Sequence, residues 1–234
     1  MKVQLHSIYL ATEGEGVFIG HAQIFVRFQG CNIGCLNCDS LDTWQFQDSG
    51  GSSLDAVLIQ ISDLGGQGAI KRVSITGGDP LHPKHIPAVM ALVDELKRRR
   101  YFVNIEAAGT RVVDQVFDRL DYISLDYKTP ATGVKTGVAN ILKMAKQYPG
   151  KFQVKAVVEN QEDFSDVLKS YKIVEDELGA INFPWCLTPC YQTTENFPQK
   201  RFQDIVQWNQ QNGGVFRVIG QQHKWIYGAK EKQV

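Results

Sequence analysis

The chain of 234 residues lacks any excess of charge, because 25 basic residues balance 25 acidic ones. Proteins that bind nucleic acid gather positive charge on one face or in a tail, and this sequence shows neither, so we expect a small-molecule partner and no nucleic acid. No uninterrupted apolar stretch is long enough to span a bilayer, and the first residues lack the apolar segment of a signal peptide. We therefore expect a cytoplasmic protein without a membrane partner.

A second pair of metal-binding residues near the main cysteine cluster is also lacking. The segment CNIGCLNCDS, residues 31–40, places Cys31, Cys35 and Cys38 close together. A structural zinc site is closed by four ligands, usually two pairs of Cys or His. Three thiols therefore predict a metal centre with one open position, which favours catalysis over scaffolding. In a reducing compartment, clustered thiols indicate metal ligands or reactive groups before disulfides.

Apolar β-branched runs alternate with amphipathic helical patterns along the chain. This alternation predicts parallel strands joined by right-handed crossovers. Six such units are fewer than the eight of a closed barrel, so the predicted fold is α/β, an open, partial (β/α)6 TIM-like barrel with parallel strands, in a single domain over residues 1–234. The strands are expected over 23–28, 70–76, 101–107, 121–126, 151–158 and 180–187, and the helices near 53–64, 84–100, 111–119, 135–148, 161–177 and 198–211. The segment QDSGGSS, residues 47–53, is predicted to be a short flexible connector.

Polar or glycine-rich segments follow the first four of these strands. The cysteine loop comes after the first strand, TGGDP (76–80) after the second, EAAGT (106–110) after the third and DYKTP (126–130) after the fourth. In barrels of this kind the active site lies at the carboxyl ends of the strands. The four segments are therefore predicted to share one mouth.

The spacing Cys-x3-Cys-x2-Cys directly after the first strand of a partial barrel resembles the radical S-adenosylmethionine superfamily. Thiolates favour iron–sulfur clusters or zinc. The resemblance implies a [4Fe–4S] cluster whose open iron chelates the amino and carboxylate groups of S-adenosylmethionine, which one electron then cleaves to a 5'-deoxyadenosyl radical. Gly77, Gly78 and Asp79 resemble the superfamily's Gly-Gly-Glu-Pro motif, although Asp is one methylene shorter than Glu. Asn37 stands where an aromatic residue is frequent.

The flanking segments narrow the resemblance to the 7-carboxy-7-deazaguanine synthase family. They are ATEGEG (11–16), FVRFQGCN (25–32), CDS (38–40), IEAAGT (105–110), SLDYKTP (124–130) and QQHKWIYG (221–228). The resemblance implies that 6-carboxy-5,6,7,8-tetrahydropterin loses a hydrogen atom from C6, and that its ring then contracts with loss of ammonia. It further implies that S-adenosylmethionine is regenerated, that Mg2+ assists, that a flavodoxin- or ferredoxin-type protein donates electrons, and that the protein is a homodimer.

The family's functional positions map onto this chain as follows. Ser40 falls on the Mg2+ ligand, and Cys31, Cys35 and Cys38 on the cluster ligands. Substrate-binding positions are Thr12, Glu13, Gly14, Arg27, Thr76 and His223. Positions that bind the cofactor S-adenosylmethionine are Asn37, Asp39, Gly77, Gly78, Asp79, Ser124, Asp126 and Lys128. A guanidinium fork such as that of Arg27 pairs bidentately with a carboxylate, which suits a carboxylated pterin.

Simpler interpretations remain for several of these residues. Arg27 lies in an apolar strand, where a structural salt bridge would also serve it, and Ser40 would suit a turn cap. For Glu106 at the mouth, the alternative to lining the site is a core carboxylate whose hydrogen bonds are all made within the protein. Cys186 and Cys190 are read as core or loop thiols before an accessory cluster. A glycyl-radical activating enzyme is the alternative activity, and a zinc-binding interaction module is the non-enzymatic one.

Overall fold

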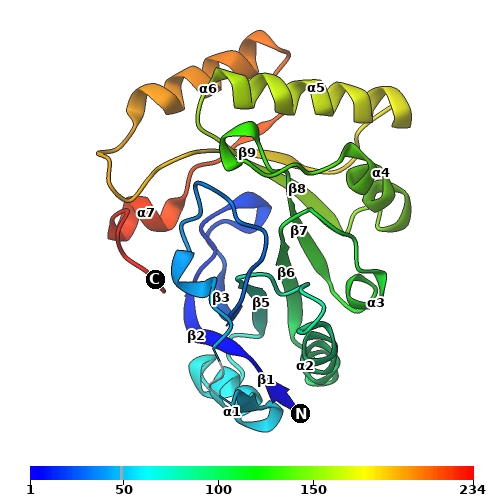
Figure 1. The fold of residues 1–234 in the computed structure, drawn as a ribbon, viewed down its shortest axis with the longest axis vertical. Coiled ribbons are helices and arrows are strands. Elements are labelled where there is room, and N and C mark those ends of the chain that lie inside the picture. The colour runs from blue at the N-terminus through cyan, green and yellow to red at the C-terminus, as the bar shows by residue number, and fades with distance from the viewer. Residues whose placement is uncertain (48–49) are drawn as a thin grey trace.

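The computed structural model describes residues 1–47 and 50–234. The main sheet has eight strands in the order β10-β9-β8-β7-β6-β5-β3-β2, and its two edges, β2 and β10, do not pair with each other within the described residues (Figure 1). These strands are β2 (Leu5–Thr12), β3 (Ala22–Phe28), β5 (Arg72–Gly77), β6 (Phe102–Ala107), β7 (Tyr122–Asp126), β8 (Phe152–Val158), β9 (Trp185–Pro189) and β10 (Arg217–Val218). A two-stranded sheet pairs β1 (Lys2–Val3) with β4 (Ser52–Ser53). The sheet is therefore an open, partial barrel.

Five of the six predicted strands are confirmed to within two residues, and the sixth, predicted over 180–187, begins only at Trp185; the strands pair in parallel from β3 to β9. Two strands were not predicted. β2 pairs antiparallel with β3, and β10 adds two residues beside β9. Repeats of one strand and one helix could not reveal β2, because only a short 3-10 helix, Gly16–Phe18, separates it from β3.

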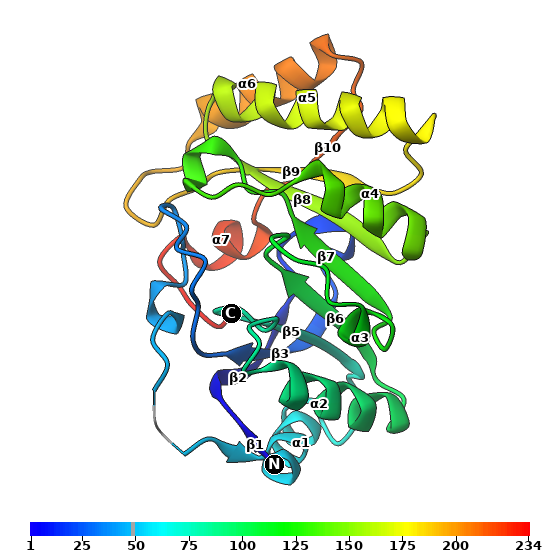
Figure 2. The same cartoon turned by 45° about the vertical axis from the view of Figure 1, so that its right-hand side comes forward.

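The helices lie along one side of the sheet, except for α7 (Figure 2). The six predicted helices are confirmed as α1 (Leu54–Leu64), α2 (Ile86–Arg98), α3 (Asp114–Phe117), α4 (Val138–Gln147), α5 (Gln161–Leu178) and α6 (Gln199–Gln211). The unpredicted α7 (Gln222–Tyr227) lies next to the cysteine loop and the C-terminus in both views. No helix in residues 1–47 and 50–234 combines the length and the apolar character needed to cross a membrane.

Alternation along the central strands separates an apolar outer layer from a polar interior. Successive side chains of a strand point to opposite faces. Val73 and Ile75 of β5 are fully buried in the hydrophobic core, as are Val103 and Ile105 of β6. The residues that alternate with them along these strands are Ser74, Thr76, Asn104 and Glu106. The inner face of the sheet is therefore polar, and it opens toward the carboxyl ends of the strands.

Local signals fix the longest helix and the loop beside it. The Asn160 side chain accepts a hydrogen bond from the Asp163 backbone N–H, and Gly179 ends α5 at a φ of 75°. Asp163 is fully buried, and its carboxylate accepts 2.9 Å hydrogen bonds from the backbone N–H groups of Ala131 and Glu159. These bonds hold the segment after β7 against α5, on the rim of the site described below.

Part of the predicted connector over 47–53 lies outside the described residues, namely positions 48 and 49. Its end is not irregular, because Ser52 and Ser53 form β4. The Ser53 hydroxyl then accepts a hydrogen bond from the Ala56 backbone N–H and caps α1.

Candidate active site

A cavity of about 760 Å³ lies at the carboxyl ends of the strands. Cys31, Gly78, Ala108 and Lys128 all line it, so the four predicted loop segments do share one mouth. The predicted site residues that line the cavity are Thr12, Glu13, Gly14, Arg27, Cys31, Cys35, Asn37, Cys38, Asp39, Ser40, Thr76, Gly77, Gly78, Asp126, Lys128 and His223. Asp79 and Ser124 are not part of the lining.

The three cysteines of the loop are partly exposed to the cavity and surrounded by hydrogen-bond donors. The backbone N–H of Ile33 donates to Cys31 Sγ at 3.4 Å. Cys38 Sγ accepts from the Ser40 backbone N–H at 3.4 Å and from the Trp44 indole N–H at 3.3 Å. Such donors favour a thiolate over a thiol, and burial otherwise raises the pKa values of Cys31 and Cys35.

Across the part of the chain that the structure describes, no three Cys, His, Asp or Glu side chains are close enough to share one metal ion. A structural zinc site needs four ligands around one ion, whereas each cysteine of an iron–sulfur cluster binds a different iron. The assignment of Cys31, Cys35 and Cys38 as cluster ligands stays a prediction.

Gly77 and Gly78 allow the TGGDP segment to pack against the end of β3. The Gly78 backbone N–H donates to the Phe28 carbonyl oxygen, and the Asp79 backbone N–H donates to that of Gly30, both at 2.9 Å. A Cβ atom would lie 2.2 Å from the Phe28 oxygen if built on Gly77, and 2.4 Å from the Gly30 oxygen if built on Gly78. The two glycines thus fix the cysteine loop, in addition to leaving the backbone open to a ligand.

The Asp79 carboxylate does not reach the cavity, although the motif predicted that it would bind the amino group of S-adenosylmethionine. It is buried, and its Oδ1 accepts a 3.0 Å hydrogen bond from the Leu81 backbone N–H. Its Oδ2 faces the Arg111 guanidinium at 3.4 Å. A short acidic side chain readily bonds the backbone two residues on, which explains why this Asp turns away from the mouth.

Arg27 of β3 is held by two hydroxyl groups. Its guanidinium donates to Ser40 Oγ and to the Tyr9 hydroxyl, each at 2.9 Å. Ser40 Oγ in turn donates to Asp39 Oδ1 at 2.9 Å. Within the described residues no carboxylate forms an ion pair with Arg27, so none of them supplies the alternative of a structural salt bridge. Its positive charge remains available to an anionic ligand.

The segment between Thr12 and Ala22, which connects β2 to β3, forms the floor of the cavity, and we call it the floor segment. The motifs did not reveal the ion pairs that form there. Lys155 Nζ of β8 lies 2.6 Å from Glu106 Oε2 and 3.3 Å from Glu15 Oε2. Gln221 Nε2 donates to the other oxygen of Glu15 at 2.7 Å. Although burial opposes it, the charges of Glu106 and Glu15 hold the pKa of Lys155 well above its usual range. Burial likewise opposes ionisation of Glu15, but Lys155 and Gln221 lower its pKa.

Asp126 at the end of β7 and Lys128 in the following loop, both predicted to bind the cofactor, contact each other on the wall of the cavity. Lys128 Nζ lies 2.6 Å from Asp126 Oδ2. Burial lowers the pKa of Lys128, but Asp126 and Cys35 outweigh it and the net shift is upward. Ser124 instead lies deeper in the interior, where it is buried and accepts a 2.8 Å hydrogen bond from Gln153 Nε2. The structure thus brings Asp126 and Lys128 to the cavity but not Ser124.

The helix α7 packs directly on the floor segment. The Gln222 backbone N–H donates to the Gly14 carbonyl oxygen at 2.9 Å, and a Cβ atom on Gly14 would lie 2.0 Å from His223 Nδ1. Burial lowers the pKa of His223, and Glu15 partly offsets this shift. Glycine at position 14 is therefore needed for the close approach of His223.

Cys186 and Cys190 of the other CxxxC segment are both buried, and burial raises the pKa of each to about 11. Thiols with such pKa values stay protonated and unreactive near neutral pH. These properties favour the interpretation of core thiols over an accessory cluster.

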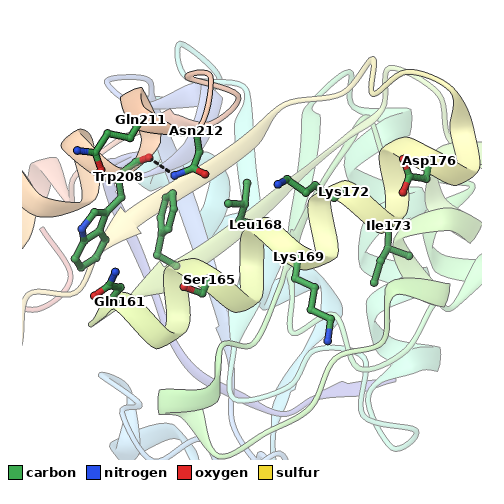
Figure 3. Close-up of a pocket in the computed structure, with 11 residues that line it drawn as sticks. Gln161, Ser165, Leu168, Lys169, Lys172, Ile173, Asp176, Trp208, Gln211 and Asn212 are labelled. Atoms are coloured by element: carbon green, nitrogen blue, oxygen red, sulfur yellow. Dashed lines mark hydrogen bonds between the residues drawn. The ribbon is translucent and has the colours of Figure 1, made fainter.

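A second hollow, of about 500 Å³, lies on the outer side of the fold between α5 and α6 (Figure 3). Its lining includes Leu168, Lys169, Lys172 and Trp208, and it comes from these two helices and Asn212 just after α6. None of the predicted site residues belongs to it. We call it the helix groove.

A parallel partial barrel with a three-thiol loop at the carboxyl ends of its strands defines a radical S-adenosylmethionine type of enzyme. In agreement, the family model of a 4Fe-4S single cluster domain matches residues 12–116. The crystal structure of QueE from Escherichia coli superposes with a TM-score of 0.64 at 20% identity and covers 95% of both chains. At that identity the likeness shows the fold.

Comparison of sequences identifies the nearer relatives. The 7-carboxy-7-deazaguanine synthase of Bacillus cereus is 27% identical over 181 residues, which span 73% of this chain and 72% of that protein. The enzyme of the same name from Escherichia coli is 31% identical over 129 residues, which span 48% of this chain and 56% of that protein. The predicted resemblance is confirmed: the chain is an enzyme related to the 7-carboxy-7-deazaguanine synthases.

Proposed function

We propose that the chain converts 6-carboxy-5,6,7,8-tetrahydropterin to 7-carboxy-7-deazaguanine and ammonia, and that residues 1–234 act as one domain in doing so. The observation that carries this proposal is the position of Arg27. The cavity holds a guanidinium that has no ion-pair partner among the described residues and that contacts Ser40 of the loop with the three thiols. A small carboxylated substrate would satisfy that charge.

The thiols of Cys31, Cys35 and Cys38 would hold a [4Fe–4S] cluster, which supplies the electron that generates an adenosyl radical from S-adenosylmethionine. Asp126 and Lys128 lie on the wall beside Cys35, within reach of the polar groups of that cofactor. Gly77 and Gly78 expose backbone groups at the same mouth. The Asp79 carboxylate would have to rotate away from Leu81 and Arg111 in order to bind the amino group.

Ser40 is the proposed ligand of Mg2+. Its hydroxyl already contacts both the Asp39 carboxylate and the Arg27 guanidinium. Mg2+ takes oxygen ligands and keeps several waters, so one hydroxyl and the substrate carboxylate suffice to orient it. Arg27 would then bind the same carboxylate from the other side, which couples the binding of metal and substrate.

The floor segment with Thr12, Glu13 and Gly14, together with Thr76 and His223, would contact the flat pterin. The reaction needs the loss of one hydrogen atom from C6 and of one nitrogen as ammonia. The supporting partners would be a flavodoxin- or ferredoxin-type electron donor and a second copy of the chain.

Anaerobic turnover tests the proposal. The cluster-reconstituted protein is incubated with the pterin, S-adenosylmethionine, Mg2+ and a strong reductant, and the products are identified by mass spectrometry. We expect 7-carboxy-7-deazaguanine and an equal amount of ammonia. Cleavage of S-adenosylmethionine with no change in the pterin would refute this substrate assignment and favour a protein substrate, as for a glycyl-radical activating enzyme.

A further inference from the structure

Three carboxyl groups lie at the floor of the cavity near a single ammonium group, and two of them pair with it. Lys155 forms ion pairs with Glu106 and Glu15. Glu13 is 7% exposed and lines the same cavity. In the part of the chain that the structure describes, no Lys, Arg or His nitrogen lies within ion-pair distance of Glu13. An ionised carboxylate in that position would be buried without a cation, which is costly.

Both hydrogen bonds to the Glu13 carboxyl are donated to it. Gln23 Nε2 lies 2.6 Å from Glu13 Oε2, and the Glu15 backbone N–H donates to Oε1 at 3.2 Å. A proton on this carboxyl is therefore not accepted by either of these two partners. It is free to be donated to an acceptor atom of a ligand in the cavity.

We propose that Glu13 works as a neutral carboxylic acid that donates a hydrogen bond to the ring edge of the bound pterin, and that ionisation of this acid weakens binding. The proposal rests on the proposed function only for the identity of the ligand. A carboxylic acid kept neutral by an apolar site can serve as a hydrogen-bond donor.

The surrounding charges support this assignment. Burial raises the pKa of Glu13 to about 7, the charge of Glu106 adds to that shift, and Lys155 opposes it. The other groups that face this floor are Glu15 from the same segment, Arg72 from β5 and His223 from α7. The pKa values of Glu15 and His223 are both lowered. Neither group therefore changes charge when the pH rises through neutrality. Lys155, whose pKa is raised, and Arg72 also stay positively charged there, whereas Glu13, with its pKa raised to about 7, titrates in this range.

Binding of 6-carboxypterin, followed by its fluorescence, tests the proposal. The cluster-reconstituted protein with S-adenosylmethionine is titrated from about pH 6 to about pH 8.5, on both sides of the raised pKa. In the parent protein we expect the affinity to fall roughly tenfold for each pH unit above the pKa of Glu13. Glu13→Gln keeps a donor and an acceptor but cannot ionise, so it should show only the pH dependence of the ligand itself.

Glu162→Gln provides the matched control, because Glu162 lies exposed at the start of α5. This variant should follow the parent protein at every pH. If Glu13→Gln also follows the parent, the proposal is wrong.

Infrared spectroscopy gives a readout that needs no ligand. The parent protein should show the absorption of a protonated carboxylic acid near neutral pH, and Glu13→Gln should lack it; the presence of that absorption in both proteins would overturn the assignment. A parent that binds 6-carboxypterin in this pH-dependent way but forms no ring-contracted product would refute the proposed function alone. Normal turnover without the pH effect would refute the role of Glu13 alone.

Discussion

The cavity and the helix groove are two hollows of this molecule that differ in where their side chains come from. The cavity draws thiols, a guanidinium and carboxylates from segments between Thr12 and Lys232. The helix groove takes its side chains from two helices and one following residue. Strand ends in a partial barrel all point to one mouth, whereas neighbouring helices expose what their own surfaces carry. A hollow in which polar side chains from distant segments come together is therefore a better indication of a functional site than a hollow alone.

The two hollows also differ in the burial and the ion pairing of their charged side chains. Lys155 is buried at the cavity, Glu106 is half-buried there, and the two form an ion pair. In the helix groove Lys169 and Lys172 lie on the outer surface of α5 and have no carboxylate within ion-pair distance among the described residues. Buried charges without partners are costly and surface charges are not. Substitutions in the cavity should therefore have large effects, and matched substitutions in the helix groove small ones.

The largest effect is expected for Cys31→Ala. A cluster with only two protein ligands should not assemble stably, so iron content and formation of 5'-deoxyadenosine should fall by more than about 100-fold, beyond the loss typical of an outer-shell partner. Iron analysis and chromatography of the nucleoside measure both. Lys172→Ala in the helix groove should retain the parent values, and a Cys31→Ala protein with full activity would refute the cluster assignment.

Lys155→Met should lower the free energy of unfolding by up to about 3–5 kcal/mol at neutral pH, because it leaves the half-buried Glu15 and Glu106 without their cation. Urea denaturation measures this change. The pKa of Glu15 is lowered in the folded parent, so the stability from its ion pair is present at neutral pH and is lost as the pH falls through that lowered pKa. The difference between parent and variant should therefore shrink in acid.

For comparison, Lys172→Met should change the unfolding free energy by at most about 0.5 kcal/mol, as is usual for surface positions. Equal losses for the two methionine variants would contradict the contrast between cavity and helix groove.

Arg27→Lys keeps the positive charge but loses the planar fork that contacts Ser40 and Tyr9. The affinity for 6-carboxypterin should fall about 10- to 100-fold, since one bidentate charged contact is worth roughly 1.5–3 kcal/mol. Pterin, which lacks the carboxylate, serves as the control ligand and should bind the two proteins with similar affinity. An unchanged affinity for 6-carboxypterin would show that Arg27 does not bind the carboxylate.

How far the sequence predicted this site depends on the distance between partners along the chain. The six strand–helix units and their shared mouth follow from local hydrophobic patterns, and all were found. The ion pairs of Lys155 with Glu15 and Glu106 depend on the pairing of β6, β7 and β8, which no local pattern specifies. Tyr9, which holds Arg27, was missed because it belongs to the unpredicted strand β2.

Asp79 shows a different limit of motif reading. The TGGDP motif correctly predicted a turn at the mouth, but the Asp side chain bonds Leu81 instead of facing the cavity. A motif predicts backbone geometry better than it predicts the direction of a shortened side chain. Ser124 fails similarly, because its neighbour Gln153 binds it deep in the interior.

The smallest effect is expected for Ser40. Ser40→Ala should leave the cluster and S-adenosylmethionine binding intact but raise the Mg2+ concentration for half-maximal turnover several-fold, roughly the effect of losing about 1 kcal/mol of metal binding. Ser40→Thr keeps the oxygen and should stay close to the parent. Titrating turnover with Mg2+ compares the three proteins, and identical metal dependence for the alanine variant would leave Ser40 as a structural partner of Arg27.

The central claim is that the cavity removes a hydrogen atom from C6 of a carboxylated tetrahydropterin. Substrate labelled with deuterium at C6 tests it most directly, with mass spectrometry of both the recovered S-adenosylmethionine and the product. Our account predicts that deuterium enters S-adenosylmethionine, because the hydrogen atom passes to the adenosyl radical before the cofactor is regenerated. Formation of ring-contracted product with no deuterium in S-adenosylmethionine would contradict it.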